Sequence, residues 1–226
     1  MDSSEMILAA ADVHKSYRSG SVVTPVLHGL GLELRRGEFV VIMGPSGCGK
    51  STFLNIIGLM MTPTRARSLV IDGVEALNLS DERRTRLRRA RIGFVFQRFN
   101  LLPVISAGDN VRLAMELRGQ RPDGRVDALF ERFGLADKID RKPGALSMGE
   151  QQRVAIARAV AGEPAILLAD EPTGNLDSGN AQQVLALLGE LNRRDGQTVV
   201  MITHNEQCIG SADRVVQMKD GRFLDT

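Results

Sequence analysis

Four short runs of apolar residues recur along the chain and predict buried strands. Each run holds five residues, and polar or turn-forming residues stand close on either side. Runs of this length are typical of strands inside a sheet, and the stretches between them have helical spacing. The pattern therefore predicts an α/β core. The runs are Phe39–Met43 (FVVIM), Ile92–Phe96 (IGFVF), Ala165–Ala169 (AILLA) and Thr198–Ile202 (TVVMI).

Weaker strand patterns occur towards both ends of the chain. Ile7–Val13 and Val26–Leu34 read as two β segments joined by the polar turn Arg18–Gly20. Ser68–Gly73 reads as a strand that ends in an Asp-Gly turn, and Asp213–Met218 predicts a closing edge strand or hairpin. We expect a mixed sheet with an antiparallel β subdomain at its N-terminal side.

Residues 98–162 carry helical patterns and no strand pattern. We expect one domain over residues 1–226, in which residues 1–97 and 163–226 form the core and residues 98–162 form an inserted α-helical lobe. The predicted helices of the lobe are a stretch capped by Ser106 that runs to Arg118, the amphipathic stretch Arg125–Phe133, and a helix that opens at Leu146–Gln152 and runs to Gly162.

The composition is that of an ordinary globular protein. The 226 residues are 43% hydrophobic and 25% charged, and the formal net charge of +2 gives no reason to expect a nucleic-acid partner. Cys48 and Cys208 lie far apart, which favours a reducing cytoplasm over a disulfide framework. The N-terminal segment lacks the apolar core of a signal peptide, and no run approaches the roughly 18 to 20 apolar residues that span a bilayer. We expect a soluble, cytoplasmic chain.

The segment Gly44–Thr52 (GPSGCGKST) is the strongest candidate for chemistry. It matches G-x-x-x-x-G-K-[ST] and lies between a predicted strand and a helical stretch, as a phosphate-binding loop requires. Lys50 would reach the β- and γ-phosphates, and the Ser51 hydroxyl would bind Mg²⁺. An ordinary glycine-rich turn is the alternative, and the flanking elements argue against it. The candidate ligand-binding residues are Gly44, Pro45, Ser46, Gly47, Cys48, Gly49, Lys50, Ser51 and Thr52.

Two adjacent carboxylates follow the run Ala165–Ala169. Asp170 stands at the strand end, where it can hold Mg²⁺ through water, and Glu171 can orient or deprotonate an attacking water. Acidic pairs at strand ends are often only turn formers. The phosphate-binding loop in the same chain favours the catalytic interpretation here.

Two further polar residues follow apolar runs. Gln97 comes after Ile92–Phe96 and can reach a ligand bound at that edge of the sheet. His204 comes just after Thr198–Ile202, and a neutral imidazole there can hydrogen-bond a γ-phosphate or a water. Taken singly, each has a plainer interpretation, as a loop residue and as a structural histidine. His204 is the fourth polar group that the pattern delivers to one sheet edge.

Tyr17 is the single tyrosine of the chain and precedes the phosphate-binding loop. An exposed aromatic ring in this place can stack on an adenine. A partly buried structural tyrosine is an equally good interpretation from the sequence.

The segment Asp81–Arg91 has helical character and an unusual charge. It carries six arginines and little apolar surface. A solvated helix face is the default interpretation, and contact with anionic lipid headgroups or an acidic partner is the alternative.

The segment Leu146–Gln152 (LSMGEQQ) is a second candidate anion site. Ser147 is a good N-cap, Gly149 and Glu150 fall in the first turn, and a helix N-terminus offers free N–H groups to an anion. A plain capped helix is the alternative.

Together these residues resemble the nucleotide-binding subunit of ATP-binding cassette (ABC) transporters, over nearly the whole chain. Gly44–Thr52 resembles the Walker A loop and Ile166–Glu171 the Walker B strand with its catalytic glutamate. Leu146–Gln152 resembles the signature motif. The remaining matches are Gln97 with the Q-loop, Asn175–Asp177 with the D-loop, His204 with the switch histidine and Tyr17 with the adenine-stacking aromatic.

The resemblance implies a Mg²⁺-dependent ATPase that forms a head-to-tail homodimer with two ATP molecules between the subunits. It assigns Glu171, His204 and Lys50 to catalysis, and Ser51, Gln97 and Asp170 to Mg²⁺. Nucleotide contacts would come from Tyr17, the loop Gly44–Thr52, Gln97, Ser147, Gly149, Glu150 and Asp177. The partner would be a membrane permease, with the chain peripheral on the inner face of the cell membrane.

The segments Ile92–Pro103 (IGFVFQRFNLLP) and Leu168–Asp177 (LADEPTGNLD) look most like the group that contains lipoprotein-releasing, macrolide-export and cell-division ATPases. A local pattern of that group is visible in Leu79–Gln97 (LSDERRTRLRRARIGFVFQ). The signature motif departs from the usual LSGGQ, because Met148 replaces the first glycine and Glu150 replaces glutamine. Met148 would add a side chain at the dimer seam.

Three function classes follow from the sequence. The favoured one is the ATPase of an exporter or lipoprotein-extracting complex. The second is an ATP-driven mechanical or regulatory clamp that signals through a membrane partner to a periplasmic enzyme. The third is a soluble kinase or other P-loop enzyme, which gives no reason for LSMGEQQ or His204. Cargo and transport direction have no signal in the sequence.

Overall fold

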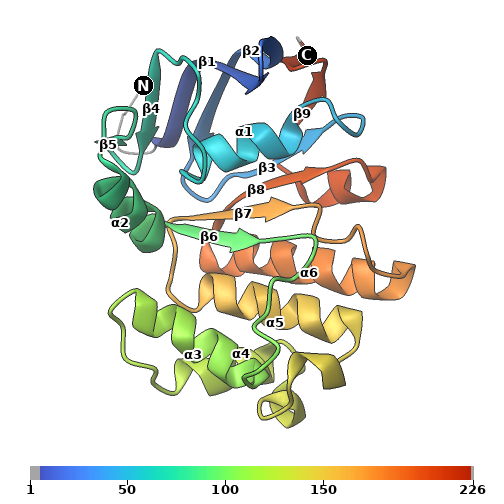
Figure 1. The fold of residues 1–226 in the computed structure, drawn as a ribbon. Helices are drawn as coiled ribbons and strands as arrows, with labels where there is room; N and C mark the ends of the chain where they lie inside the picture. The colour runs from blue at the N-terminus through green and yellow to red at the C-terminus, as the bar shows by residue number, and fades with distance from the viewer. Residues whose placement is uncertain (1–5, 225–226) are drawn as a thin grey trace.

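Of the two sheets in the described residues, one is antiparallel, is built from strands of the first 75 residues and lies in the upper part of Figure 1. In the computed structural model, which describes residues 6–224 without the side chains of residues 207 and 211, its order is β2-β1-β4-β5. The N-terminal segment, which we do not expect to be a signal peptide, has its first five residues outside the described range. The strands are β1 (Met6–Ser19), β2 (Val22–Arg35), β4 (Ser68–Ile71) and β5 (Val74–Glu75).

The first two strands are longer than the hydrophobic pattern predicts. Each has 14 residues, and the turn between them is Gly20–Ser21 instead of Arg18–Gly20. Residues 17–25 are exposed. The pairing of this end therefore rests on backbone hydrogen bonds, which leave no apolar pattern in the sequence.

The second sheet has the order β10-β9-β3-β8-β7-β6 and confirms the predicted mixed sheet. In this sheet β9, β3, β8, β7 and β6 are all parallel to one another. The edge strand β10 pairs antiparallel with β9. The four apolar runs all become strands of this sheet. The strands are β3 (Phe39–Met43), β6 (Ile92–Val95), β7 (Ile166–Asp170), β8 (Thr198–Thr203), β9 (Arg214–Lys219) and β10 (Arg222–Phe223).

Both faces of the central strands β3, β8 and β7 are buried, which explains their unbroken apolar runs. Along β3, Phe39, Val41 and Met43 face one core cluster, which contains residues of the helices on one side. Val40 and Ile42 face the other cluster, which contains α1 and the antiparallel sheet. All five residues are at most 5% exposed.

The helices between β6 and β7 form the predicted helical lobe, in the lower part of Figure 1. Ser106 caps α3 as predicted, through a hydrogen bond from Asp109 N. The last long helix ends at Asp195 and is capped by Gly196, which has φ 66°. The α-helices are α1 (Lys50–Ile57), α2 (Asp81–Arg91), α3 (Ala107–Leu117), α4 (Arg125–Arg132), α5 (Met148–Val160) and α6 (Ser178–Asp195), and the 3₁₀ turns are Ala136–Lys138, Pro143–Ala145 and Glu206–Ser211.

Helix α2 lies on the surface, and none of its residues, all of which are described, is buried. Two of its arginines nevertheless contact residues outside the helix. Arg88 Nη1 donates to Leu59 O at 2.6 Å, and Arg91 pairs with Asp72 at 2.9 Å. The solvated-face interpretation therefore describes only the outer side of the helix.

Among the helices of residues 6–224, none combines the length and the apolar character that a membrane crossing needs.

Candidate active site at the carboxyl edge of the sheet

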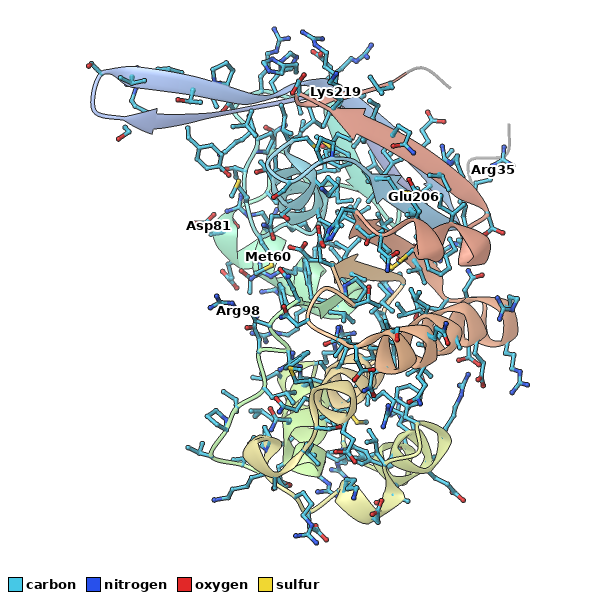
Figure 2. All side chains as sticks on the ribbon, turned by 90° about the vertical axis from the view of Figure 1, so that its right-hand side faces the viewer. Arg35, Met60, Asp81, Arg98, Glu206 and Lys219 are labelled. Carbon is cyan, nitrogen blue, oxygen red and sulfur yellow. The ribbon has the colours of Figure 1, made fainter. Side chains whose placement is uncertain are left out.

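The register of the parallel strands brings the predicted site residues to one edge. Met43 pairs with Thr203, Ile202 with Asp170, and Ala169 with Val95. The phosphate-binding loop, the two carboxylates, His204 and Gln97 therefore leave the sheet side by side. This is the right-hand edge in Figure 1, and Figure 2 turns it towards the viewer, with Glu206 marking the segment after His204.

The loop after β3 has a shape that only its glycines allow. Gly47 and Gly49 have φ 80° and 108°, in the left-handed region. A Cβ on Gly44 would overlap the carbonyl oxygen of Met218. The neighbouring Cys48 is buried, and its carbonyl accepts a hydrogen bond from Gly221 N at 3.0 Å. The closing hairpin thus supports the loop from behind.

Lys50 is buried in the mouth of this loop. Its side chain is 5% exposed, and Nζ donates to Gly44 O at 2.7 Å and to Pro45 O at 2.9 Å. An ammonium has three N–H donors, so one remains for an anion in the loop. The positive charge is therefore fixed in place before any ligand arrives.

Ser51 and Asp170 meet across the base of the cleft. Ser51 Oγ donates to Asp170 Oδ1 at 3.1 Å. Burial raises the pKa of Asp170, and the nearby charge of Glu171 adds to this, while Ser51 and Lys50 act in the opposite direction. A hydroxyl and a carboxylate oxygen are ligands that suit Mg²⁺. The described residues hold no cluster of three His, Cys, Asp or Glu side chains for a metal, so such a cation would complete its shell with water and substrate oxygens.

Replacing Asp170 with asparagine should raise the melting temperature of the nucleotide-free protein at pH 7, by roughly 1–3 °C. The folded-state pKa lies above the unfolded value, so ionisation of Asp170 costs stability as the pH rises through the folded pKa. Asparagine removes this charge and keeps an acceptor for Ser51. Differential scanning calorimetry measures the shift.

Asp109→Asn is the control of opposite sign, because Ser106 and Arg112 lower the pKa of Asp109. That variant should not melt at a higher temperature. A lower melting temperature for Asp170→Asn would show that burial does not dominate the ionisation of Asp170.

Glu171 and His204 contact each other directly. His204 Nδ1 lies 2.7 Å from Glu171 Oε2, with side-chain exposures of 64% for the histidine and 16% for the carboxylate. Glu171 has φ 46°, and its N–H donates to Ile202 O at 3.0 Å. Both side chains line a hollow of about 400 Å³ beside the turn that follows β7. The sequence places both at this edge but cannot show that they pair.

A cleft of about 350 Å³ lies between the phosphate-binding loop and these carboxylates. Tyr17 stands at its rim, 42% exposed, and its hydroxyl lies 3.4 Å from Thr52 Oγ1 and 3.3 Å from Met61 Sδ. The ring is thus exposed and anchored at once. The lining residues are Tyr17, Val26, Ser46, Gly47, Gly49, Lys50, Ser51, Thr52, Gln97, Asp170 and Glu171.

Gln97 reaches the same cleft and is fixed by the turn after Glu171. Asn175 Nδ2 donates to Gln97 O at 2.9 Å. A Cβ on Gly174 would come within 2.8 Å of Gln97 Nε2. The start of the helical lobe is therefore held against the carboxylate loop.

The start of α5 lies outside this cleft. Ser147, Gly149 and Glu150 are not among the described residues that line it. Ser147 Oγ accepts from Glu150 N at 3.2 Å, and Glu150 Oε2 accepts from Ser147 N at 2.7 Å, which makes a capping box. The bond from the Ser147 backbone lowers the pKa of Glu150. Glutamate at this position thus stabilises the helix start and leaves the amides of Met148 and Gly149 for an anion.

Gly149 is packed against the start of α6. A Cβ on Gly149 would overlap the side chain of Asn180, which donates to Asp177 Oδ2 at 2.7 Å. Asp177 is the N-cap of α6 and also accepts from Asn180 N at 2.8 Å. The sequence does not identify Asn180 as part of this contact, although its place three residues after the N-cap Asp177 indicates that the two interact. Met148, beside Gly149, is 54% exposed.

Comparisons with known proteins identify the family of the chain. The ABC transporter family model matches residues 27–174. The lipoprotein-releasing system ATP-binding protein LolD 1 of Rhodopseudomonas palustris is 45% identical over 96% of this chain and 98% of its own. The macrolide export ATP-binding/permease protein MacB of Syntrophobacter fumaroxidans is 42% identical over 95% of this chain and 31% of its own. The chain thus spans about a third of the length of its MacB relatives.

A solved structure has the same fold. The dimeric post-hydrolysis structure of the ATP-binding cassette MJ0796 bound to ADP and Pi has a TM-score of 0.89 to this chain, at 40% identity and 97% coverage of both chains. MJ0796 is a protein of Methanocaldococcus jannaschii. The family model covers more than half of the chain, and the fold and the relatives agree with it: the chain belongs to the ABC transporter family.

Proposed function

We propose that the chain binds ATP in the cleft of the phosphate-binding loop and hydrolyses it with Mg²⁺ to energise a membrane transporter. The observation that carries this is the convergence of Lys50, Asp170, Glu171 and His204 at one sheet edge. The buried Lys50 and the candidate metal ligand Asp170 line one cleft together with Glu171, and Glu171 also lines the hollow that holds its partner His204. The family membership supports the same reaction.

The residues divide the work by position. The N–H groups of Gly44–Thr52 cradle the phosphates, and the Lys50 ammonium stabilises charge on the γ-phosphate. Ser51 and Asp170 would hold Mg²⁺, with Gln97 at the same cleft. Mg²⁺, when bound, neutralises charge on the phosphate oxygens. Tyr17 offers an exposed ring to the adenine.

Glu171 is the proposed general base. Its carboxylate accepts the proton of a water that attacks the γ-phosphate. The imidazole of His204, 2.7 Å away, fixes the orientation of that carboxylate. Asp170 accepts from Ser51 whereas Glu171 pairs with His204, so the two carboxylates serve different roles.

The site is completed by a second copy of the chain. The start of α5, with Ser147, Gly149 and Glu150, lies in the helical lobe outside its own cleft. In a head-to-tail homodimer this helix start and Asp177 would close the cleft of the other copy, with ATP between them. The MJ0796 relative is dimeric.

The proposed partner is a membrane permease, which the name of the MacB relatives, an ATP-binding/permease protein, supports. The chain would then work at the cytoplasmic face of the cell membrane, as one ATPase domain with residues 98–162 as its lobe. An ATP-driven clamp acting on a periplasmic enzyme is the second candidate. Identification of the permease and of any large periplasmic domain in it separates the two.

Phosphate release tests the reaction. The full chain with ATP and Mg²⁺ should release phosphate without any acceptor, whereas a kinase would need one. Chelation of the metal should abolish the release. A rate no higher than that of Lys50→Ala would refute ATP hydrolysis at this site.

A further inference from the structure

Gln152 is a buried side chain that joins α5 to the loop after Glu171. Its side chain is 0% exposed, and Nε2 donates to Pro172 O at 2.8 Å. Pro172 is buried as well, so its carbonyl depends on a protein donor. The bond connects the two elements that carry the two halves of the proposed composite site.

The carbonyl that Gln152 binds belongs to the residue directly after Glu171. The backbone of Glu171 is in the left-handed region, with φ 46°. Its N–H donates to Ile202 O and its carbonyl accepts from Gly174 N, both at 3.0 Å. A non-glycine residue keeps such a conformation only when its surroundings fix it. Through the hydrogen bond from Gln152 to the Pro172 carbonyl, α5 helps to hold the backbone of Glu171 in this conformation.

The same helix begins at the proposed anion site. Gly149 lies three residues before Gln152, within one turn of α5. If anion binding shifts the start of the helix, Gln152 should move with it and displace the Pro172 carbonyl to which it is hydrogen-bonded.

The other end of the Gln152 amide argues against a merely structural role. Oε1 is buried and accepts no hydrogen bond from any described protein group. A buried acceptor without a partner costs folding free energy, so an apolar residue of the same size would serve packing equally well. What the amide provides is its N–H donor to Pro172.

We propose that Gln152 is a positioning residue that couples the anion site at the start of α5 to the placement of Glu171 in the same subunit. The inference rests on the proposed function, because it presumes hydrolysis by Glu171 and a shared site. In the dimer, Gln152 makes each glutamate respond to the nucleotide held in the other copy's phosphate-binding loop.

Gln152→Met tests the coupling, since it removes the donor and keeps the volume. We expect kcat to fall about tenfold, the KM for ATP to stay within about twofold, and the Hill coefficient for ATP to fall towards one. The melting temperature should change little, because an unpaired Pro172 carbonyl replaces an unpaired Gln152 Oε1. Gln152→His retains an N–H at a similar reach and should restore part of kcat.

Asn192→Leu is the matched control. Asn192 is another buried amide, 8% exposed, and its Nδ2 donates to Gly37 O at 2.7 Å and Gln197 O at 3.0 Å, at the opposite edge of the sheet. This variant should melt at a lower temperature than Gln152→Met and keep its kcat within about twofold.

Three outcomes would overturn the proposal. They are a wild-type kcat and Hill coefficient in Gln152→Met, an equal loss of kcat in both variants, and failure of Gln152→Met to fold, since the amide would then be structural. A wild-type chain that releases no phosphate would instead refute the proposed ATPase function.

Discussion

Replacing Glu171 with glutamine should lower ATP turnover by on the order of 10²-fold or more and leave ATP binding intact. The amide has nearly the shape of the carboxylate but cannot take a proton from water. Glu171 contacts His204 through its side chain and Ile202 through its backbone, and neither contact involves the phosphate-binding loop. Steady-state phosphate release gives the turnover, and isothermal titration calorimetry with ATP gives the affinity.

Glu206→Gln is the control for the loss of one negative charge in the same hollow. We expect turnover within about threefold of wild type, because Glu206 is exposed and does not face the phosphate-binding loop. Near-normal hydrolysis in Glu171→Gln would remove Glu171 from the role of general base.

Replacing Gly149 with alanine should also lower turnover, by on the order of 10²-fold, through the shared site. The new Cβ would overlap Asn180, whose side chain is tied to Asp177. Either the start of α5 or the start of α6 must then move, and both belong to the surface proposed to close on the other copy. Affinity of the isolated cleft for ATP should stay within about twofold, because Gly149 does not line it.

Gly144→Ala separates this effect from the general cost of the substitution. Gly144 lies in the same lobe, in the 3₁₀ turn before α5, and an added Cβ there meets no heavy atom within 4 Å. This variant should turn over ATP like wild type. Equal losses in the two variants would show that the contact with Asn180 is not the cause.

The sheet could be predicted from the sequence because burial on both faces leaves long apolar runs, as in Phe39–Met43. The ends of β1 and β2 could not, because residues 17–25 are exposed and their pairing leaves no pattern. The last turn of α6 leaves no apolar pattern either. That turn carries Arg193 and Arg194, whose positive charges are favourable at a helix C-terminus.

The gathering of the site residues followed from a simple rule, that parallel strands present their carboxyl ends at one edge. The contacts within the site did not. The pair Glu171–His204 and the bond from Gln152 to Pro172 join residues that are remote in sequence and depend on how the elements pack. Glu150 shows the opposite case. The sequence presents it as a departure from the usual motif, and the structure shows it completing a capping box that a local pattern could have revealed.

The central claim is that the phosphate-binding loop of one copy and the start of α5 of another form one site. Static light scattering of the Glu171→Gln variant tests it most directly, because ATP that is bound but not hydrolysed should hold the two copies together. We predict the mass of a dimer with saturating ATP and Mg²⁺, and of a monomer without nucleotide. A monomer mass at saturating ATP and Mg²⁺ would contradict the shared site.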